Sequence, residues 1–187
     1  MCSSDLGSLW TWGDNSDGLL ENGTTTDGHV PIKIMENVKS VSLGTYHSAA
    51  IKEDGSLWTW GYNYSGQLGN GTNTDSNVPT KIMDNVKRVS LGSHHSAAIK
   101  EDGSLWTWGP NYRGQLGDGS YTGSNVPIKI MENVRSVSLG GIHSAAIKED
   151  GSLWTWGLNR YGQLGDGTNT NSNVPIKIMN LYGTSVS

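Results

Sequence analysis

The heptapeptide Gly-Ser-Leu-Trp-Thr-Trp-Gly occurs four times in this chain, and it constrains the fold more than any other feature. Its copies begin at Gly7, Gly55, Gly103 and Gly151, so the spacing is 48 residues each time. A fixed period of about 20 to 50 residues is typical of repeat architectures. Residues that return in every copy are therefore predicted to build the repeat, and residues that differ between copies are candidates for function.

The repeat divides the chain into a short leader and an array. The leader covers residues 1–6 and the array covers residues 7–187. We place the copies at residues 7–54, 55–102, 103–150 and 151–187. The leader differs from the Ile-Lys-Glu-Asp that precedes the heptapeptide elsewhere, and its Cys-Ser-Ser-Asp-Leu is what a common sequencing-adapter stretch would encode. We therefore expect the leader to be non-native and leave it out of the fold prediction.

Composition excludes several classes of function. The formal net charge is −4, the isoelectric point is about 5.6 and no run of Lys or Arg stands out. The electrostatic footprint of a nucleic-acid-binding protein is therefore missing. No segment approaches about 18 consecutive apolar residues, so we expect no membrane span. Cys2 is the only cysteine, which rules out an intramolecular disulfide.

Each copy is predicted to form four short antiparallel strands. In the copy at residues 87–133 the alternating apolar runs are Val89–Leu91, His95–Lys100, Leu105–Trp108 and Val126–Met131. The Asp-Gly pair between the second and third runs predicts a type I′ hairpin. Pro127 places the fourth strand at the outer edge of its sheet. Four such strands without helical periodicity are typical of a propeller blade, whereas the alternative, a solenoid, usually has shorter coils that pair in parallel.

Two segments carry a resemblance to a known family. Residues 43–51 read Leu-Gly-Thr-Tyr-His-Ser-Ala-Ala-Ile, and residues 55–69 read Gly-Ser-Leu-Trp-Thr-Trp-Gly-Tyr-Asn-Tyr-Ser-Gly-Gln-Leu-Gly. With a later Val-Pro, this pattern resembles the repeat of the regulator of chromosome condensation family, here as a bacterial-type tandem array. The resemblance covers about Gly7 to Met179. It implies an all-β, seven-bladed propeller with four-stranded antiparallel blades.

The chain is expected to supply only part of such a propeller. The first copy lacks the first two strands, and the last copy ends at Thr184 to Ser187, where the next blade would begin. We therefore predict a partial beta-propeller, an open arc of about three full blades of 48 residues plus parts of another. Further blades of the same array are expected to be missing, and the unpaired edges at its ends would favour aggregation.

The recurring histidines and tryptophans have structural explanations as well as chemical ones. His47, His95 and His143 could form a ring of metal ligands, but identical residues in every blade favour a role in which each imidazole ties its own turn to a neighbouring backbone group. Paired tryptophans such as Trp106 and Trp108 could form a sugar-binding platform, but their place in a central strand favours packing between blades. No nucleophile–base set, cofactor motif or metal motif is found, so we expect no enzyme and no cofactor.

The copies differ most in the turn after the first strand and in the long loop after the third strand. In an up-and-down sheet both connections emerge on one face, whereas the hairpin after the second strand, invariant as Lys-Glu-Asp-Gly-Ser, emerges on the opposite face. The variable positions are rich in Tyr and Arg, which are enriched at binding hot spots. We predict the partner-binding residues to be Tyr46, Tyr62, Tyr64, His94, Tyr112, Arg113, Tyr121, Ile142, Arg160 and Tyr161. Drift in unconstrained surface loops is the alternative explanation.

The sequence favours a non-catalytic scaffold that binds a protein partner through the loop face of a propeller. The resemblance suggests two alternatives. One is a guanine nucleotide exchange factor for a small GTPase, as the family's founding member is. The other is a protein inhibitor of an enzyme, because some bacterial propellers of this type inhibit beta-lactamases. The acidic balance argues against the chromatin binding of the founding member. An enzyme such as a hydrolase or lyase is a further alternative. We expect the array to be extracellular or at the surface of a bacterial cell.

Overall fold

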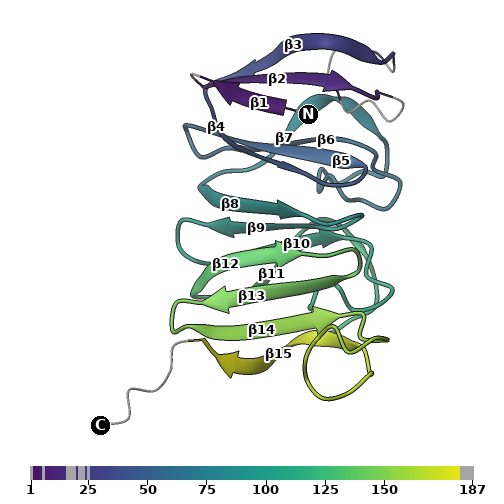
Figure 1. Ribbon diagram of the computed structural model, residues 1–187, viewed down its shortest axis with the longest axis vertical. Helices are drawn as coiled ribbons and strands as arrows, with labels where there is room; N and C mark the ends of the chain where they lie inside the picture. The colour runs from purple at the N-terminus through teal and green to yellow at the C-terminus, as the bar shows by residue number, and fades with distance from the viewer. Residues whose placement is uncertain (1, 6, 16–19, 21–23, 25, 182–187) are drawn as a thin grey trace.

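Four antiparallel sheets lie side by side in an open row (Figure 1). The computed structural model describes residues 2–5, 7–15, 20, 24 and 26–181, with only the backbone considered for residues 2–5. Strands make up the regular structure in this part of the chain, so the predicted all-β class is confirmed. Among the described residues no helix is long and apolar enough to cross a membrane.

Three of the sheets have four strands joined in simple sequence order. The second sheet contains β4 (Val38–Leu43), β5 (His47–Lys52), β6 (Leu57–Gly61) and β7 (Ser76–Met83). The third contains β8 (Val86–Leu91), β9 (Ser96–Lys100), β10 (Leu105–Gly109) and β11 (Ser124–Met131). The fourth contains β12 (Val134–Leu139), β13 (His143–Lys148), β14 (Ser152–Gly157) and β15 (Ser172–Asn180). These sheets confirm the predicted blades, and Pro127 lies in β11, at the edge of its sheet as predicted.

The first sheet has three strands and makes the array an open arc of three full blades and part of another. Its strands are β1 (Cys2–Asp5), β2 (Ser8–Gly13) and β3 (Gly28–Glu36). β1 pairs antiparallel with β2 and holds the place that β5 holds in the second sheet. The expectation that the first copy lacks its second strand is therefore wrong, because leader residues occupy that position. The expectation that the leader is non-native stays a prediction. Residues 182–187, where the next blade was expected to begin, lie outside the described part of the chain.

The hairpin after the second strand differs from the predicted type I′ turn. Gly55 has φ of +79°, but Asp54 is not among the described non-glycine residues with positive φ. The Gly55 amide donates to Lys52 O at 2.9 Å, which fits a type I turn followed by a left-handed glycine. The Asp54 carboxylate accepts hydrogen bonds from the Ser56 amide at 2.9 Å and the Ser56 hydroxyl at 2.6 Å. These bonds fix Asp54 in the turn, and the same bonds at Asp102 and Asp150 explain why Asp-Gly-Ser recurs in the hairpins of the three full blades.

A tryptophan from each full sheet is buried against the preceding sheet. In the junction between the second and third sheets, Trp108 packs with Ala49, Ile51 and Leu57. The next junction repeats this arrangement around Trp156. The prediction that the tryptophans pack between blades is confirmed. Because the cores lie between sheets rather than within them, each blade depends on its neighbours for burial.

A polar network crosses the same junctions. His47 Nε2 lies 2.8 Å from Ser96 Oγ, and Ser96 Oγ donates to Gln67 O at 2.7 Å. Since the serine hydrogen is directed at Gln67, the imidazole must donate its Nε2–H to the serine oxygen. Trp108 Nε1 donates to the same carbonyl at 2.9 Å. We call this set the junction network. The next junction repeats it: His95 Nε2 lies 2.9 Å from Ser144 Oγ, and Gln115 O accepts from Ser144 Oγ at 2.8 Å and from Trp156 Nε1 at 2.9 Å.

The junction network corrects the predicted role of the histidines. Each imidazole was expected to tie its own turn to a backbone group, but its partner is a serine side chain of the next sheet. The described residues contain no group of three or more His, Cys, Asp or Glu side chains placed to hold a metal ion. The histidines therefore join blades, which explains their 48-residue spacing.

Acidification is expected to destabilise the array through the buried histidines. Burial, with smaller effects from other histidines, lowers the pKa of His47 and of His95 to about 3. The unfolded chain takes up these protons near pH 6.5 and the folded chain does not. The free energy of unfolding should therefore fall by about 1.4 kcal/mol per pH unit below pH 6.5 for each imidazole. Urea unfolding at pH 7 and pH 5 measures this slope. A flat profile, or an equal slope in a chain carrying His47→Gln and His95→Gln, would contradict it.

Two equivalent glycines separate backbone strain from contact between blades. Gly69 has φ of +74°, and a Cβ there would lie 2.7 Å from Trp108 Nε1. Gly165 has φ of +73°, but its Cβ would meet nothing closer than Ile178 at 3.8 Å. Gly165→Ala should therefore cost about 1 kcal/mol for the backbone alone. Gly69→Ala should cost at least about 1 kcal/mol more, because the tryptophan must move. Chemical unfolding of both variants measures the difference, and equal costs would show that the junction is loosely packed.

Candidate functional site

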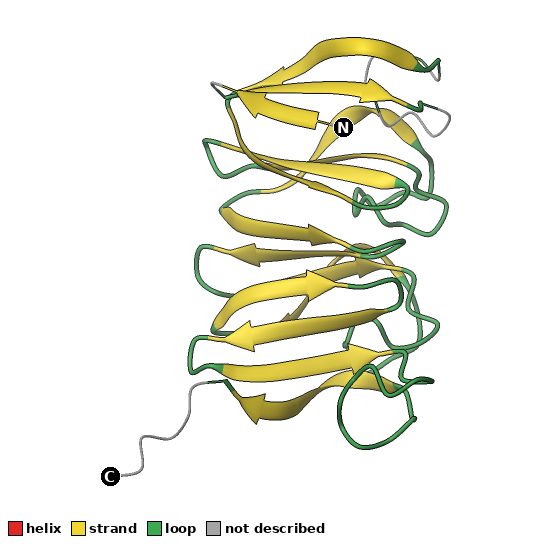
Figure 2. Cartoon of the chain, in the orientation of Figure 1, coloured by secondary structure: helices red, strands yellow, loops and turns green. Residues whose placement is uncertain are grey.

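The long loops and the first turns of the three full blades share one side of the row, and the short hairpins lie on the other (Figure 2). We call the first side the loop face. It comprises the turns at residues 44–46, 92–94 and 140–142 and the loops at residues 62–75, 110–123 and 158–171. In the second and fourth sheets the turn is bonded to its own loop, because the Tyr62 amide donates to Tyr46 O and the Leu158 amide donates to Ile142 O, each at 2.9 Å. All of the predicted partner-binding residues lie on this face.

A buried asparagine holds each long loop in shape. Asn63 has no exposed surface. Its side chain accepts a hydrogen bond from the Leu68 amide at 2.9 Å and donates to Thr72 O at 3.1 Å and Thr74 O at 3.0 Å. Asn111 and Asn159 repeat this arrangement. The loops are therefore rigid platforms, and Asn63, although it begins an Asn-Tyr-Ser glycosylation sequon, is inaccessible to a modifying enzyme.

Four predicted residues form a continuous aromatic cluster across the junction between the second and third sheets. The rings of Tyr46 and His94 stack with centroids 4.9 Å apart and planes inclined by 21°. Tyr62 lies 6.1 Å from Tyr46, and Tyr64 lies 6.5 Å from Tyr62. Tyr46 is 38% exposed and Tyr64 is 74% exposed. We call these residues the aromatic cluster. It offers stacking surfaces and phenol hydroxyls to solvent.

The remaining predicted residues line two hollows beside the cluster. Tyr112 and Tyr121 line a polar hollow of about 490 Å³, where Asn125 Nδ2 donates to Asn73 Oδ1 at 3.0 Å. A neighbouring hollow of about 670 Å³ is lined by residues of the third and fourth sheets. Its predicted members are Tyr112, Arg113, Ile142, Arg160 and Tyr161. Tyr112 belongs to both hollows, so the two sets adjoin, but their role in binding stays a prediction.

Part of the variation between loops has a structural cause that the sequence did not reveal. Asp75 accepts a hydrogen bond from the Asn63 amide at 2.6 Å, and Asn171 does the same for Asn159 at 2.8 Å. Gly123 stands at this position in the third sheet, where a Cβ would lie 3.0 Å from Gly109 O. The equivalent residues Asp75, Gly123 and Asn171 therefore differ because each fits the support of its own loop. This position supplies no binding residue, although it differs between copies.

The invariance of the hairpin side also has a structural cause. Trp58 Nε1 donates to Ser56 Oγ at 2.9 Å, and Lys52 Nζ lies 5.1 Å from the centre of a Trp58 ring. The Glu53 amide donates to Asn37 O at 2.8 Å, and Asn37 itself has φ of +58°. These contacts recur in the next hairpins. The repeated residues of this side therefore build the blade.

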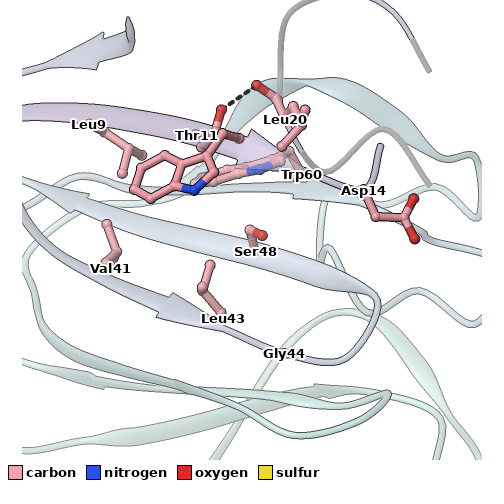
Figure 3. Close-up of a pocket in the computed structure, with 11 residues that line it drawn as sticks. Leu9, Thr11, Asp14, Leu20, Val41, Leu43, Gly44, Ser48 and Trp60 are labelled. Carbon is pink, nitrogen blue, oxygen red and sulfur yellow. Dashed lines mark hydrogen bonds between the residues drawn. The ribbon is translucent and has the colours of Figure 1, made fainter. Parts of the chain in front are cut away.

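A further hollow, which the sequence did not predict, lies between the first and second sheets (Figure 3). It has a volume of about 250 Å³. Leu9, Thr11 and Leu20 form one wall, and Thr11 Oγ1 donates to Leu20 O at 2.7 Å. The opposite wall comes from β4, β5 and β6 and includes Val41, Leu43, Ser48 and Trp60. No sequence motif predicted this hollow, because it forms where the described part of the first sheet has no counterpart of β4.

A family model described as RCC1-like domain matches residues 1–187. The chain belongs to the RCC1-like domain family. The resemblance inferred from the repeat is thereby confirmed. The bacterial type of this RCC1-like array stays a prediction.

Solved structures share the fold of this RCC1-like chain. Human WBSCR16 matches with a TM-score of 0.82 and 26% identity, over 94% of this chain and 49% of that chain. Yeast RCC1 (Prp20), bound to Kap60, matches with a TM-score of 0.82 and 24% identity, over 94% and 45%. Prp20p from Saccharomyces cerevisiae, described with its binding to Gsp1p and histones, matches with a TM-score of 0.81 and 24% identity, over 94% of this chain and 47% of that chain. This chain thus spans about half the length of these proteins, and no curated protein sequence matches it.

Proposed function

We propose that this RCC1-like array is a non-catalytic scaffold whose protein partner contacts the loop face. The observation that carries the proposal is the aromatic cluster, in which Tyr62 and Tyr64 stand on a loop whose backbone is fixed by the buried Asn63. Exposed aromatic side chains on a rigid support lose little conformational freedom on binding. Tyr and Arg are also the residue types that contribute most often to binding hot spots.

The hydrogen-bond geometry argues against the enzyme alternative. His47 and Ser96 lie at the distance of a base and nucleophile pair, but neither has any exposed surface. The serine hydrogen is donated to Gln67 O and the imidazole donates to the serine, so the imidazole nitrogen that faces the serine carries a proton and cannot accept another. The most enzyme-like pair in the described junctions is therefore a connection between blades.

The exchange-factor alternative predicts an activity that the scaffold proposal does not. Prp20p is described with binding to Gsp1p, but an identity of 24% supports a shared fold and does not transfer that binding. An exchange factor would accelerate release of labelled GDP from Gsp1p. The scaffold proposal expects no acceleration.

We also propose that the array is extracellular or lies at the surface of a bacterial cell.

Site-specific photo-crosslinking tests the proposed face. A benzoylphenylalanine replaces Tyr64 in one chain and Glu53, on the hairpin side, in a matched control. In extracts of the source cells, a protein should be captured from position 64 and not from position 53. Combined Tyr46→Ala and Tyr62→Ala substitutions should abolish that capture while the unfolding curve stays near that of the parent chain. Capture from position 53 alone, or from neither position, would contradict the proposal.

A further inference from the structure

The long loop of the third sheet leaves one backbone donor without a partner at the polar hollow. In the other sheets the amide of the equivalent asparagine donates to a side-chain oxygen of its own loop. The pairs are Asn15 with Asp27, Asn63 with Asp75 and Asn159 with Asn171, at 2.9, 2.6 and 2.8 Å. Gly123 stands at the third sheet's supporting position and brings no oxygen, so no described residue accepts a hydrogen bond from the Asn111 amide. Both residues line the hollow, and a Cβ on Gly123 would lie 3.6 Å from Asn111 N.

The acidic residues of the loops indicate that the missing acceptor is a neutral oxygen. The third loop already has a carboxylate at its buried asparagine, because Asp118 Oδ1 accepts from the side-chain amide of that asparagine at 2.9 Å. The fourth loop has the same contact with Asp166, and its supporting residue is the uncharged Asn171. In the second loop the charges are exchanged: Asn70 makes the first contact and Asp75 makes the second. Each loop thus holds one carboxylate at its asparagine, and an anionic ligand beside Asp118 would be repelled.

The rest of the polar hollow offers an acceptor and two aromatic rings. Asn125 Nδ2 donates to Asn73 Oδ1 at 3.0 Å, and no described residue donates to Asn125 Oδ1. Tyr112 is 53% exposed and Tyr121 is 56% exposed. Among the described residues no charged side chain lines this hollow. An uncharged site with a donor, an acceptor and aromatic faces matches hydroxyl groups, which donate and accept, on a ring that also has an apolar face.

We propose that the polar hollow is a binding site for a neutral sugar residue. One sugar hydroxyl accepts the Asn111 N–H, and another donates to Asn125 Oδ1. Tyr112 and Tyr121 pack against the C–H face of the sugar ring. The sugar belongs to a polysaccharide or to the glycan of a glycoprotein, which present the same chemistry to the hollow. The site uses no residue of the aromatic cluster, so this inference goes beyond the proposed protein partner and does not depend on it.

A glycan array tests the proposal with the full chain. The array carries neutral fragments of polysaccharides, neutral glycans of glycoproteins, and counterparts of both in which one hexose is replaced by the corresponding uronate. The chain should bind members of the neutral set, and each bound glycan should bind about tenfold more tightly than its uronate counterpart, because Asp118 repels the added carboxylate. The neutral set that binds identifies the source of the sugar.

Two substitutions place the sugar in the polar hollow. Tyr112→Ala should weaken binding about tenfold, whereas Tyr64→Ala, at the equivalent position 48 residues earlier and outside the hollow, should leave it unchanged. Gly123→Asn gives the Asn111 amide the internal acceptor that Asn171 provides in the fourth sheet, so it should weaken binding at least about tenfold. A Cβ there would lie 3.0 Å from Gly109 O, so urea unfolding accompanies this variant. The exposed Tyr112 keeps the test valid if Gly123→Asn does not fold.

Several outcomes would overturn the proposal. Binding to no neutral glycan, or a preference for the uronate counterparts, would show that the hollow does not recognise a neutral sugar. Equal losses in the Tyr112→Ala and Tyr64→Ala chains would place the glycan elsewhere on the loop face. If no glycan binds and Tyr112→Ala abolishes protein capture from position 64, the hollow is part of the protein interface. That result would leave the proposed scaffold function standing, whereas glycan binding without protein capture would leave only the sugar site.

Discussion

The carbonyl of Gln67 is the point at which two neighbouring blades are fastened together. It accepts hydrogen bonds from Ser96 Oγ at 2.7 Å and from Trp108 Nε1 at 2.9 Å, and both donors come from the next sheet. Ser96 Oγ in turn accepts a hydrogen bond from the imidazole of His47, which belongs to the first of the two sheets. One buried set of polar groups thus fixes the separation and the register of adjacent sheets, and the apolar clusters pack around it. Because buried hydrogen bonds demand specific geometry, the array has one arrangement at each junction.

This constraint explains how the repeat can vary on one side and stay constant on the other. The junction network and the hairpins need the same residues in every copy, so the hairpin side and the interior repeat. The long loops begin and end at positions that the sheets fix, and Asn63 and its equivalents hold the path between them. The exposed side chains of the loops are then free to differ. A rigid frame with changeable side chains on one face suits recognition.

Alternation of apolar residues was enough to predict the blade. The run Val126–Met131 became β11 at Ser124–Met131, and Pro127 indicated its edge position because proline cannot donate to a second neighbour. The predicted type I′ turn was wrong because the Asp54 carboxylate accepts hydrogen bonds from Ser56, and the Asp-Gly pair alone does not predict that contact. The partner of His47 was also mispredicted, since it lies 49 residues away on another sheet and periodicity alone does not show which side chains meet across a junction. The sequence placed the candidate binding residues on one face, but the stacking of Tyr46 on His94 depends on blade spacing and needed the structure.

The most direct test of the junction network compares one serine position with and without its imidazole. Ser96 and Ser48 occupy the same place in the repeat, but His47 donates to Ser96 and no described residue does the same for Ser48. Measured by urea unfolding at pH 7, Ser96→Ala should lower the free energy of unfolding by about 1 to 3 kcal/mol, because a buried N–H loses its acceptor. Ser48→Ala should change it by less than about 0.5 kcal/mol. Equal effects of the two substitutions would contradict the claim that this network holds the blades together.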